Sequence, residues 1–208
     1  VAQRPKLEGE RDLELLLEVS RALTTHLDLH DLFAAISGSI RRLIQHDYAS
    51  LCLYDPELRQ LRLHALDFPG GSGLIREEIL IAVQGSPHGK VFTTLQPLLV
   101  KHLTAEQFPA DITNWLVSEG IQSACWVPMQ RADRCIGVLN VASKHQDAFT
   151  EREMVLLDQI ANQIAIAVEN ALAFQQITEL KNKLAEEKDY LEDEIRTEYH
   201  YDEMVGES

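Results

Sequence analysis

The sequence predicts an α+β fold, in which a central antiparallel sheet is flanked by helices from both ends of the chain. Apolar residues recur every three to four positions in residues 10–44 and again in residues 150–196, as in amphipathic helices. Between these segments, apolar and polar residues alternate in short runs separated by turn-forming Gly, Pro and Asp. Because strands gathered between terminal helices are typical of α+β proteins, we expect the terminal helices to pack on one face of the sheet.

Length and charge narrow the classes of protein further. The 208 residues suffice for one domain and an appended helix, and 45% of them are hydrophobic, enough for an ordinary core. The net charge is −14, of which −7 lies in residues 176–208, so we expect the chain itself to bind no nucleic acid. No segment has the length of a bilayer span or the pattern of a signal peptide. We therefore expect a cytoplasmic protein without membrane association.

Two helices are expected before the sheet. After a flexible segment at residues 1–9, leucines mark one side of a helix over residues 10–27. A second helix follows at once, with Asp28 as a plausible N-cap. Its apolar positions keep a near-perfect helical period: Leu29, Leu32, Phe33, Ile36, Ile40, Leu43 and Ile44.

Six strands are expected in the middle of the chain. The first two form a hairpin around Asp55-Pro56, and the last two are joined by a polar turn. Residues 105–119, between the fourth and fifth strands, are expected to be helical or looped. The expected strands are residues 50–54, 61–66, 79–83, 98–100, 121–129 and 135–143, with a short helix at 90–95 introduced by Gly85–Gly89.

The last helix is expected to be long and to carry a coiled-coil seam. Thr150 is its N-cap, with Glu153 in the first turn, and an unbroken helix through Arg196 would be roughly 70 Å long. One helix cannot bury an apolar seam, so we expect a homodimer through residues 176–200. The seam consists of Ile177, Leu180, Leu184, Leu191 and Ile195, and it is interrupted by Glu187 and Glu194, which favours a transmitter over a permanent clamp.

The order of elements resembles a GAF domain, a small-molecule sensing fold related to PAS, over residues 10–175. The resemblance implies a ligand site between one sheet face and the inserted segment at residues 68–118. It rests on Gly89, Gln96-Pro97-Leu98, Gly120-Ile121-Gln122-Ser123, Val127-Pro128-Met129, Ile136-Gly137-Val138-Leu139-Asn140-Val141-Ala142-Ser143 and Phe149-Thr150-x-x-Glu153.

The end of the chain resembles the linker that enters the AAA+ ATPase of sigma-54-dependent activators. The matching segments are residues 190–198 and 201–208, and within that family they are most similar to the formate hydrogenlyase transcriptional activator group. The resemblance implies a sensor at 10–175, a signalling helix at 176–200 and the start of a truncated AAA+ domain at 201–208. DNA and sigma-54 RNA polymerase would then be bound by further domains. The sequence holds no G-x-x-x-x-G-K-[ST] motif, so we expect no ATPase in this chain.

A small anion is one candidate ligand, and formate is the one that the family resemblance suggests. A helix N-terminus offers free N–H groups and a partial positive charge, and Pro87 suits the first turn of such a helix. Ser86, His88 and Lys90 would add donors there. Alternatively, Ser86 is only a helix cap and Lys90 is a solvated side chain.

Residues of the expected central strands form a second group of ligand candidates: Cys52, Tyr54 and Trp126. Because side chains alternate along a strand, some residues here, Cys125 included, will face the helices rather than the pocket. Cys and Trp on strands are also common core residues.

Other functions and cofactors receive less support. Lys144, Phe149 and Glu153 partly match the motif of cyclic-nucleotide-binding GAF domains, but Ser143 and Glu153 depart from it, and we expect a structural Lys144–Glu153 pair instead. The three cysteines and eight histidines show no metal-ligand spacing, so we expect no metal or other cofactor.

Three alternative functions stay open. The first is a ligand-free dimerisation scaffold, and the second is a GAF module that feeds a histidine kinase or cyclase. The third is a GAF-fold free methionine sulfoxide reductase with cysteines in its pocket. The expected strand positions of the cysteines favour inert buried thiols, so the main expectation is a regulatory domain that is not an enzyme.

Overall fold

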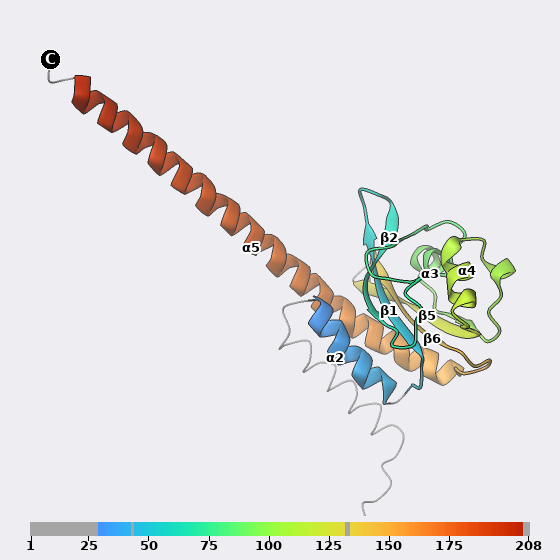
Figure 1. Cartoon of the computed structure of the whole chain (residues 1–208). Helices are drawn as coiled ribbons and strands as arrows, with labels where there is room; N and C mark the ends of the chain where they lie inside the picture. Colours follow the sequence, from blue (N-terminus) through green and yellow to red (C-terminus); the bar gives the residue numbers. More distant parts are fainter. Residues whose placement is uncertain (1–28, 43, 132–133, 206–208) are drawn as a thin grey trace, which may run out of the picture. The chain divides into compact units, whose positions relative to one another are not determined.

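The computed structural model describes residues 29–42, 44–131 and 134–205 (Figure 1). The predicted helix at 10–27, the expected cap Asp28 and the apolar residue Leu43 lie outside the described residues. The chain divides into two compact units, Val1–Glu169 and Asn170–Ser208. The first unit contains the sheet and its helices, and the second contains the C-terminal part of the last helix.

A six-stranded antiparallel sheet in the order β3-β2-β1-β6-β5-β4 forms the centre of the first unit. This arrangement confirms the predicted α+β fold with a central antiparallel sheet. The predicted strand at 79–83 is wrong in extent, because only two of its residues pair. The strands are β1 Tyr48–Asp55, β2 Gln60–Asp67, β3 Leu80–Ile81, β4 Leu98–Val100, β5 Ser123–Arg131 and β6 Arg134–Ser143.

The helices cover opposite faces of the sheet (Figure 1). Helix α2 (Leu29–Arg41) and the part of α5 (Glu151–Val205) up to Glu169 lie on one side, and α3 (Pro87–Thr94) and α4 (Asp111–Ser118) lie on the other. Neighbouring residues of β5 point to opposite faces of the sheet. Cys125 faces α5, where burial and the carboxylates of Asp158 and Glu153 raise the pKa of its thiol, whereas Trp126 donates a hydrogen bond to His88 of α3. A 3₁₀ turn, Ala105–Gln107, precedes α4.

Two glycines allow close contacts between backbone segments. A Cβ on Gly89 in α3 would lie 1.7 Å from the carbonyl oxygen of Val83, and one on Gly137 in β6 would lie 2.1 Å from that of Cys52. The first contact brings the start of α3 directly against the chain that leaves β3. The helix begins at Pro87, after the N-cap Ser86, rather than at Lys90 as predicted.

Helix α5 begins with the predicted cap. The Thr150 N–H and hydroxyl donate to the Glu153 carboxylate at 2.8 and 2.7 Å, and the Glu153 N–H donates back to the Thr150 hydroxyl at 3.3 Å. This capping box satisfies N–H groups that would otherwise have no partner. The helix continues to Val205, beyond the predicted end at Arg196.

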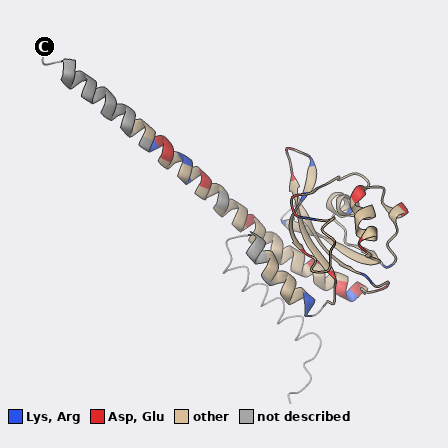
Figure 2. Cartoon of the chain, viewed as in Figure 1, with Lys and Arg blue, Asp and Glu red and all other residues tan. Residues whose placement is uncertain are grey.

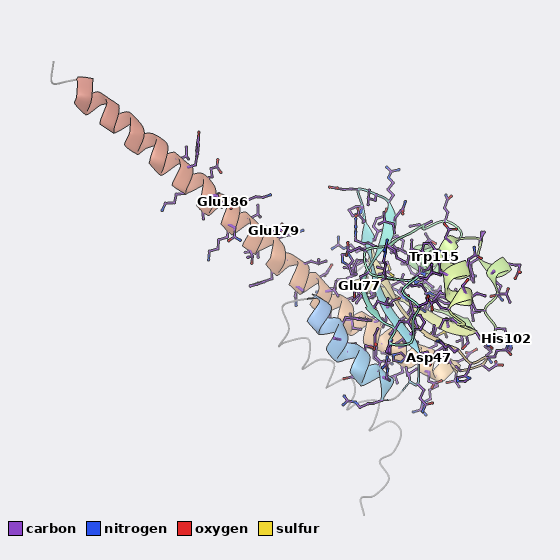
Figure 3. The ribbon with its side chains drawn as sticks, viewed as in Figure 1. Asp47, Glu77, His102, Trp115, Glu179 and Glu186 are labelled. Atoms are coloured by element: carbon purple, nitrogen blue, oxygen red, sulfur yellow. The ribbon has the colours of Figure 1, made fainter. Side chains whose placement is uncertain are left out.

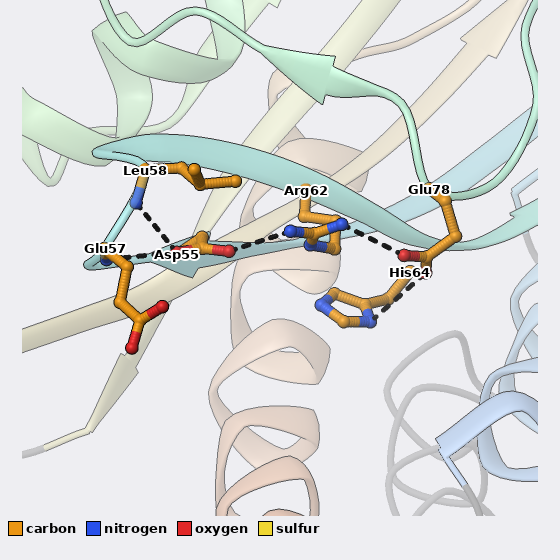
Figure 4. A network of polar contacts seen from close by, with 6 residues as sticks. All are labelled: Asp55, Glu57, Leu58, Arg62, His64 and Glu78. Atoms are coloured by element: carbon orange, nitrogen blue, oxygen red, sulfur yellow. Dashed lines mark hydrogen bonds and ion pairs between the residues drawn. The ribbon is translucent and has the colours of Figure 1, made fainter.

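Charged side chains line the surface of the tip of the β1–β2 hairpin (Figure 4). Arg62 bridges Asp55 at 2.9 Å and Glu78 at 3.2 Å, and the Leu58 N–H and Arg62 lower the pKa of the Asp55 carboxyl. His64 lies 4.0 Å from Glu78. Ion pairs this open to solvent contribute little to stability, so we treat the network as a surface feature.

The described part of α5 beyond Asn170 is acidic and exposes apolar side chains. Glu179 and Glu186 extend away from the helix axis (Figure 3), and red segments mark acidic residues along this stretch (Figure 2). Ile177, Leu180 and Leu184 are 60–65% exposed. The side chain of Ile195, the last residue of the predicted seam, lies outside the described ones.

Candidate functional site

Three neighbouring strands place a row of side chains on the sheet face that α3 and α4 cover. The register pairs Ser50 with Asn140 and Asn140 with Trp126, so all three share one face. Each of them is fully buried. We call the buried side chains between this face and helices α3 and α4 the interior layer.

His88 meets Trp126 in the interior layer. The indole Nε1–H of Trp126 donates to His88 Nε2 across 3.3 Å, with the rings edge to face. Burial lowers the pKa of His88 to about 3, so the imidazole is neutral at pH 7. An indole nitrogen can only donate, so the single imidazole proton must be on Nδ1. His88 Nδ1 is buried and has no hydrogen-bond partner among the described residues, which leaves an unsatisfied donor.

Four more buried polar side chains of this layer carry an atom that is unpartnered within the described residues. The hydroxyl of Ser50 and the amide oxygen of Asn140 belong to the row, and the Tyr48 phenol lies two residues from Ser50 on the same face of β1. The Thr113 hydroxyl comes from the buried face of α4. Each such group costs roughly 1–3 kcal/mol when it has no partner. Five of them in one layer are groups that water or a small polar ligand could partner.

The interior layer offers neutral donors rather than charges. Burial raises the pKa of Tyr48 above its usual value, so its phenol stays protonated. Among the described residues, no Lys, Arg, Asp or Glu is fully buried. Three hydroxyls and one imidazole N–H can donate to oxygen atoms of a ligand, and the Asn140 oxygen can accept. Such a set suits a small molecule with two or more acceptor oxygens, a carboxylate included.

The structure separates the three predicted anion-site residues. Ser86 is the N-cap of α3, where its hydroxyl accepts from the Gly89 N–H at 2.9 Å, and its carbonyl accepts from the Lys90 N–H at 3.0 Å. His88 belongs to the interior layer. The Lys90 side chain is exposed, with its ammonium 5.9 Å from the centre of the Phe108 ring. An anion role for this helix start therefore stays a prediction, and the contacts made by Ser86 are those of a cap.

The other predicted ligand residues do gather on one face. Cys52, Tyr54 and Trp126 belong to one core cluster, and the Tyr54 ring stacks on Phe92 of α3 with 4.6 Å between centroids. Cys125 faces α5 instead, as the alternation along β5 requires. Whether any of the three clustered residues touches a ligand stays a prediction.

The predicted Lys144–Glu153 pair is wrong. The Lys144 ammonium donates to the Gly70 carbonyl at 3.3 Å and lies over the Phe68 ring, while the Glu153 carboxylate is held by Thr150. Capping competes successfully for Glu153 because Thr150 is three residues away on the same helix end.

Sequence reasoning missed Tyr48, Ser50, Thr113 and Asn140. Strand alternation was the available signal for two of them, since Tyr48 and Ser50 precede the candidate Cys52 at intervals of two. Asn140 would have required the register between strands. Thr113 lies in the segment predicted only as helical or looped, so its face was not predictable.

Within the described ranges, no three His, Cys, Asp or Glu side chains are placed to hold a metal ion. Likewise, no described helix is both long and apolar enough to cross a bilayer. All three cysteines are free thiols.

Comparison with protein families gives a match to the GAF domain over residues 28–168. The chain is 27% identical over 205 residues to the formate hydrogenlyase transcriptional activator FhlA of Escherichia coli K12, covering 96% of this chain and 29% of that protein. It is also 27% identical over 211 residues to the DNA-binding transcriptional activator HyfR of the same organism, covering 97% and 31%. The chain thus spans less than a third of the length of these relatives.

Solved structures show the same fold. The GAF domain of an Acinetobacter phosphoenolpyruvate-protein phosphotransferase superposes with a TM-score of 0.63 at 18% identity, covering 81% of this chain and 97% of that one. The free methionine-R-sulfoxide reductase of Neisseria meningitidis, in complex with its substrate, gives 0.66 at 17% identity, covering 83% and 97%. At these identities the likeness concerns the fold alone, and the predicted fold family is confirmed.

Proposed function

Because the chain belongs to the GAF domain family, we propose that it is the ligand-sensing regulatory domain of a bacterial sigma-54-dependent transcription activator. The relatives that match nearly the whole chain are named as transcriptional activators, and those from Escherichia coli and Salmonella typhimurium include formate hydrogenlyase transcriptional activators. Fold alone does not define function, so the proposal rests on the interior layer. Its five unpartnered polar atoms are the observation that carries the proposal.

A small carboxylate is the ligand class that these atoms suit best, and formate is the first molecule to test. The names of the relatives link them to formate hydrogenlyase. In the interior layer, neutral N–H and O–H donors would meet the two carboxylate oxygens, as preorganised dipoles do in buried anion sites. Bound formate would also favour the protonated form of His88 and raise its pKa.

Transmission would use helix α5. Residues 176–200 carry the apolar seam, and three of its members are at least 60% exposed in a single chain. A second copy of the same helix would bury them, so we propose a parallel homodimer whose helices lead into an AAA+ ATPase that begins near residue 201. DNA and sigma-54 RNA polymerase would be bound by other domains. Regulation requires that ligand binds two states of the dimer with different affinity.

Calorimetric titration with sodium formate tests the sensing function. The 208-residue chain should bind formate, and Thr113→Val, which keeps the shape but removes a buried hydroxyl, should weaken binding. Ser118→Ala is the matched control, because that exposed hydroxyl donates to the Asn114 carbonyl on the same helix. Equal affinities of the Thr113 and Ser118 variants, or no heat with any of them, would sink the proposal.

A ligand-free dimerisation scaffold is the second candidate. Its support is the dense interior, where Trp126 and Tyr48 are among the largest fully buried side chains. Reductase chemistry has less support. Burial raises the pKa values of Cys52 and Cys125 to about 12, so both stay as unreactive thiols at pH 7.

A further inference from the structure

Gln130 of β5 contacts helices on both faces of the sheet. Its side-chain Nε2 donates to the carbonyl of Leu95 at 3.1 Å, and Leu95 is the left-handed C-cap of α3, with φ of 59°. Its backbone N–H donates to the Asn162 side-chain oxygen on α5 at 3.4 Å. One residue is therefore hydrogen-bonded to the end of α3 and to the part of α5 that packs on the sheet.

An irregularity in the sheet lies beside the second bond. The β5–β6 register shifts between Met129 and Gln130, so that Met129 pairs with Gly137 and Gln130 with Cys135. The extra residue of this bulge is Ile136 of β6, and such a bulge locally disrupts the ladder of hydrogen bonds. Here the N–H of Gln130 is directed to Asn162 of α5.

The turn end of the β5–β6 hairpin also contacts α5 at a second place. Arg131 Nε and Arg134 Nη2 donate to the two oxygens of Glu169 at 3.1 and 2.8 Å, and Arg134 together with Arg131 lowers the pKa of the Glu169 carboxyl. These two arginines lie within four residues of Gln130. A displacement of this hairpin end would therefore act on α5 at both Asn162 and Glu169, two turns of helix apart.

We propose that Gln130 is the positioning residue that couples helix α3 to helix α5. The inference rests on the proposed ligand role of the interior layer: a ligand beside His88 moves α3, the Leu95 carbonyl moves with it, and the Gln130 backbone passes the change to Asn162. Coupling of this kind needs contiguous contacts whose arrangement both elements bias, and the two Gln130 hydrogen bonds supply them. Gln130 need not touch the ligand.

Hydrogen exchange measured without any ligand tests the coupling separately from sensing. Ser86→Ala removes the cap of α3 and should loosen that helix; because caps contribute about 1 kcal/mol, exchange in α3 should rise about fivefold. In the otherwise unchanged chain, we expect amides of α5 around residues 158–169 to exchange faster as well. The double variant adds to Ser86→Ala the change Gln130→Met, which keeps the Gln130 backbone N–H but removes Nε2. In this double variant, the faster exchange in α5 should vanish while the faster exchange in α3 stays.

A matched variant separates coupling from general destabilisation. Gln107→Ala removes the side-chain bond from Nε2 to the His102 carbonyl at 3.0 Å and the bond that Oε1 accepts from the Thr104 N–H at 3.2 Å, and it should leave the α5 response intact. If Ser86→Ala fails to fold, Thr93→Ala, which removes bonds to the Gly89 and Lys90 carbonyls, gives a milder perturbation of α3. An α5 response that is absent from the start, or that survives Gln130→Met, overturns the proposal. Neither result bears on whether formate binds.

Discussion

The hydrogen bond from Trp126 Nε1 to His88 Nε2 fixes which imidazole nitrogen carries the proton. Because both rings are fully buried, bulk solvent does not compete for that bond. The Nδ1–H donor is thereby held ready for a ligand oxygen. Trp126, which does not need to touch the ligand, would thus determine the donor that His88 presents.

Trp126→Phe should destabilise the chain and weaken ligand binding. The substitution keeps an aromatic ring but leaves His88 Nε2 without its donor, which costs about 1–3 kcal/mol in the free energy of unfolding. Urea unfolding at pH 7 measures this cost. Trp115→Phe is the control, since Trp115 is only partly buried, and a similar loss in both variants would contradict the special role of the indole N–H.

His88 should make the chain sensitive to acid. Its pKa is about 3 in the folded chain and near 6.5 when unfolded, so the unfolded state binds the extra proton between these values. Stability contributed by neutral His88 is therefore complete above pH 6.5 and is lost as the pH falls toward 3. Between pH 6.5 and 5, the loss should be about 2 kcal/mol.

Urea unfolding of His88→Gln at several pH values isolates this contribution. Burial also lowers the pKa values of His46 and His64, so the unchanged chain will lose more than one proton-linked contribution. The glutamine variant should show a shallower pH dependence by about one proton. Identical slopes for the two chains would show that His88 is not buried in its neutral form.

Two glycine substitutions should change the stability of the folded chain in opposite directions. Gly89→Ala would place a Cβ 1.7 Å from the Val83 carbonyl oxygen, a backbone atom that cannot move alone, so the variant should lose the α3 packing or fail to fold. Gly38→Ala in α2 meets nothing within 4 Å and should stabilise the chain by up to about 1 kcal/mol. Thermal unfolding compares them, and a folded Gly89→Ala chain of normal stability would refute the close contact.

The seam should hold two copies together. Leu180→Lys combined with Leu184→Lys places two charges on the proposed interface and should convert a dimer into a monomer in light scattering. Glu179→Lys with Glu186→Lys is the control, since both glutamates extend from the helix and neither belongs to the seam (Figure 3). A chain that is monomeric before any change would contradict the dimeric transmitter.

Periodicity predicted the elements of this fold far better than it predicted the site. The strand at 98–100 and the cap Thr150 follow from local chemistry, and both are found where they were expected. The strand at 79–83 is shorter than predicted because only Leu80 and Ile81 pair with β2, and pairing with a distant strand lies beyond any local pattern. The interior row depends on strand register, which brings together Ser50, Asn140 and Trp126 from positions far apart in the sequence.

The most direct test of the sensing role uses the two tryptophans as internal reporters. In nitrogen-15 NMR spectra, the indole N–H signals of Trp126 and Trp115 report on the interior layer and on the partly buried side of α4, respectively. Titration with sodium formate, with sodium chloride as the ionic control, should shift the Trp126 signal and leave that of Trp115 in place. If formate, acetate and formamide all leave the Trp126 signal unchanged, the interior layer is not a ligand site and the sensing role is contradicted.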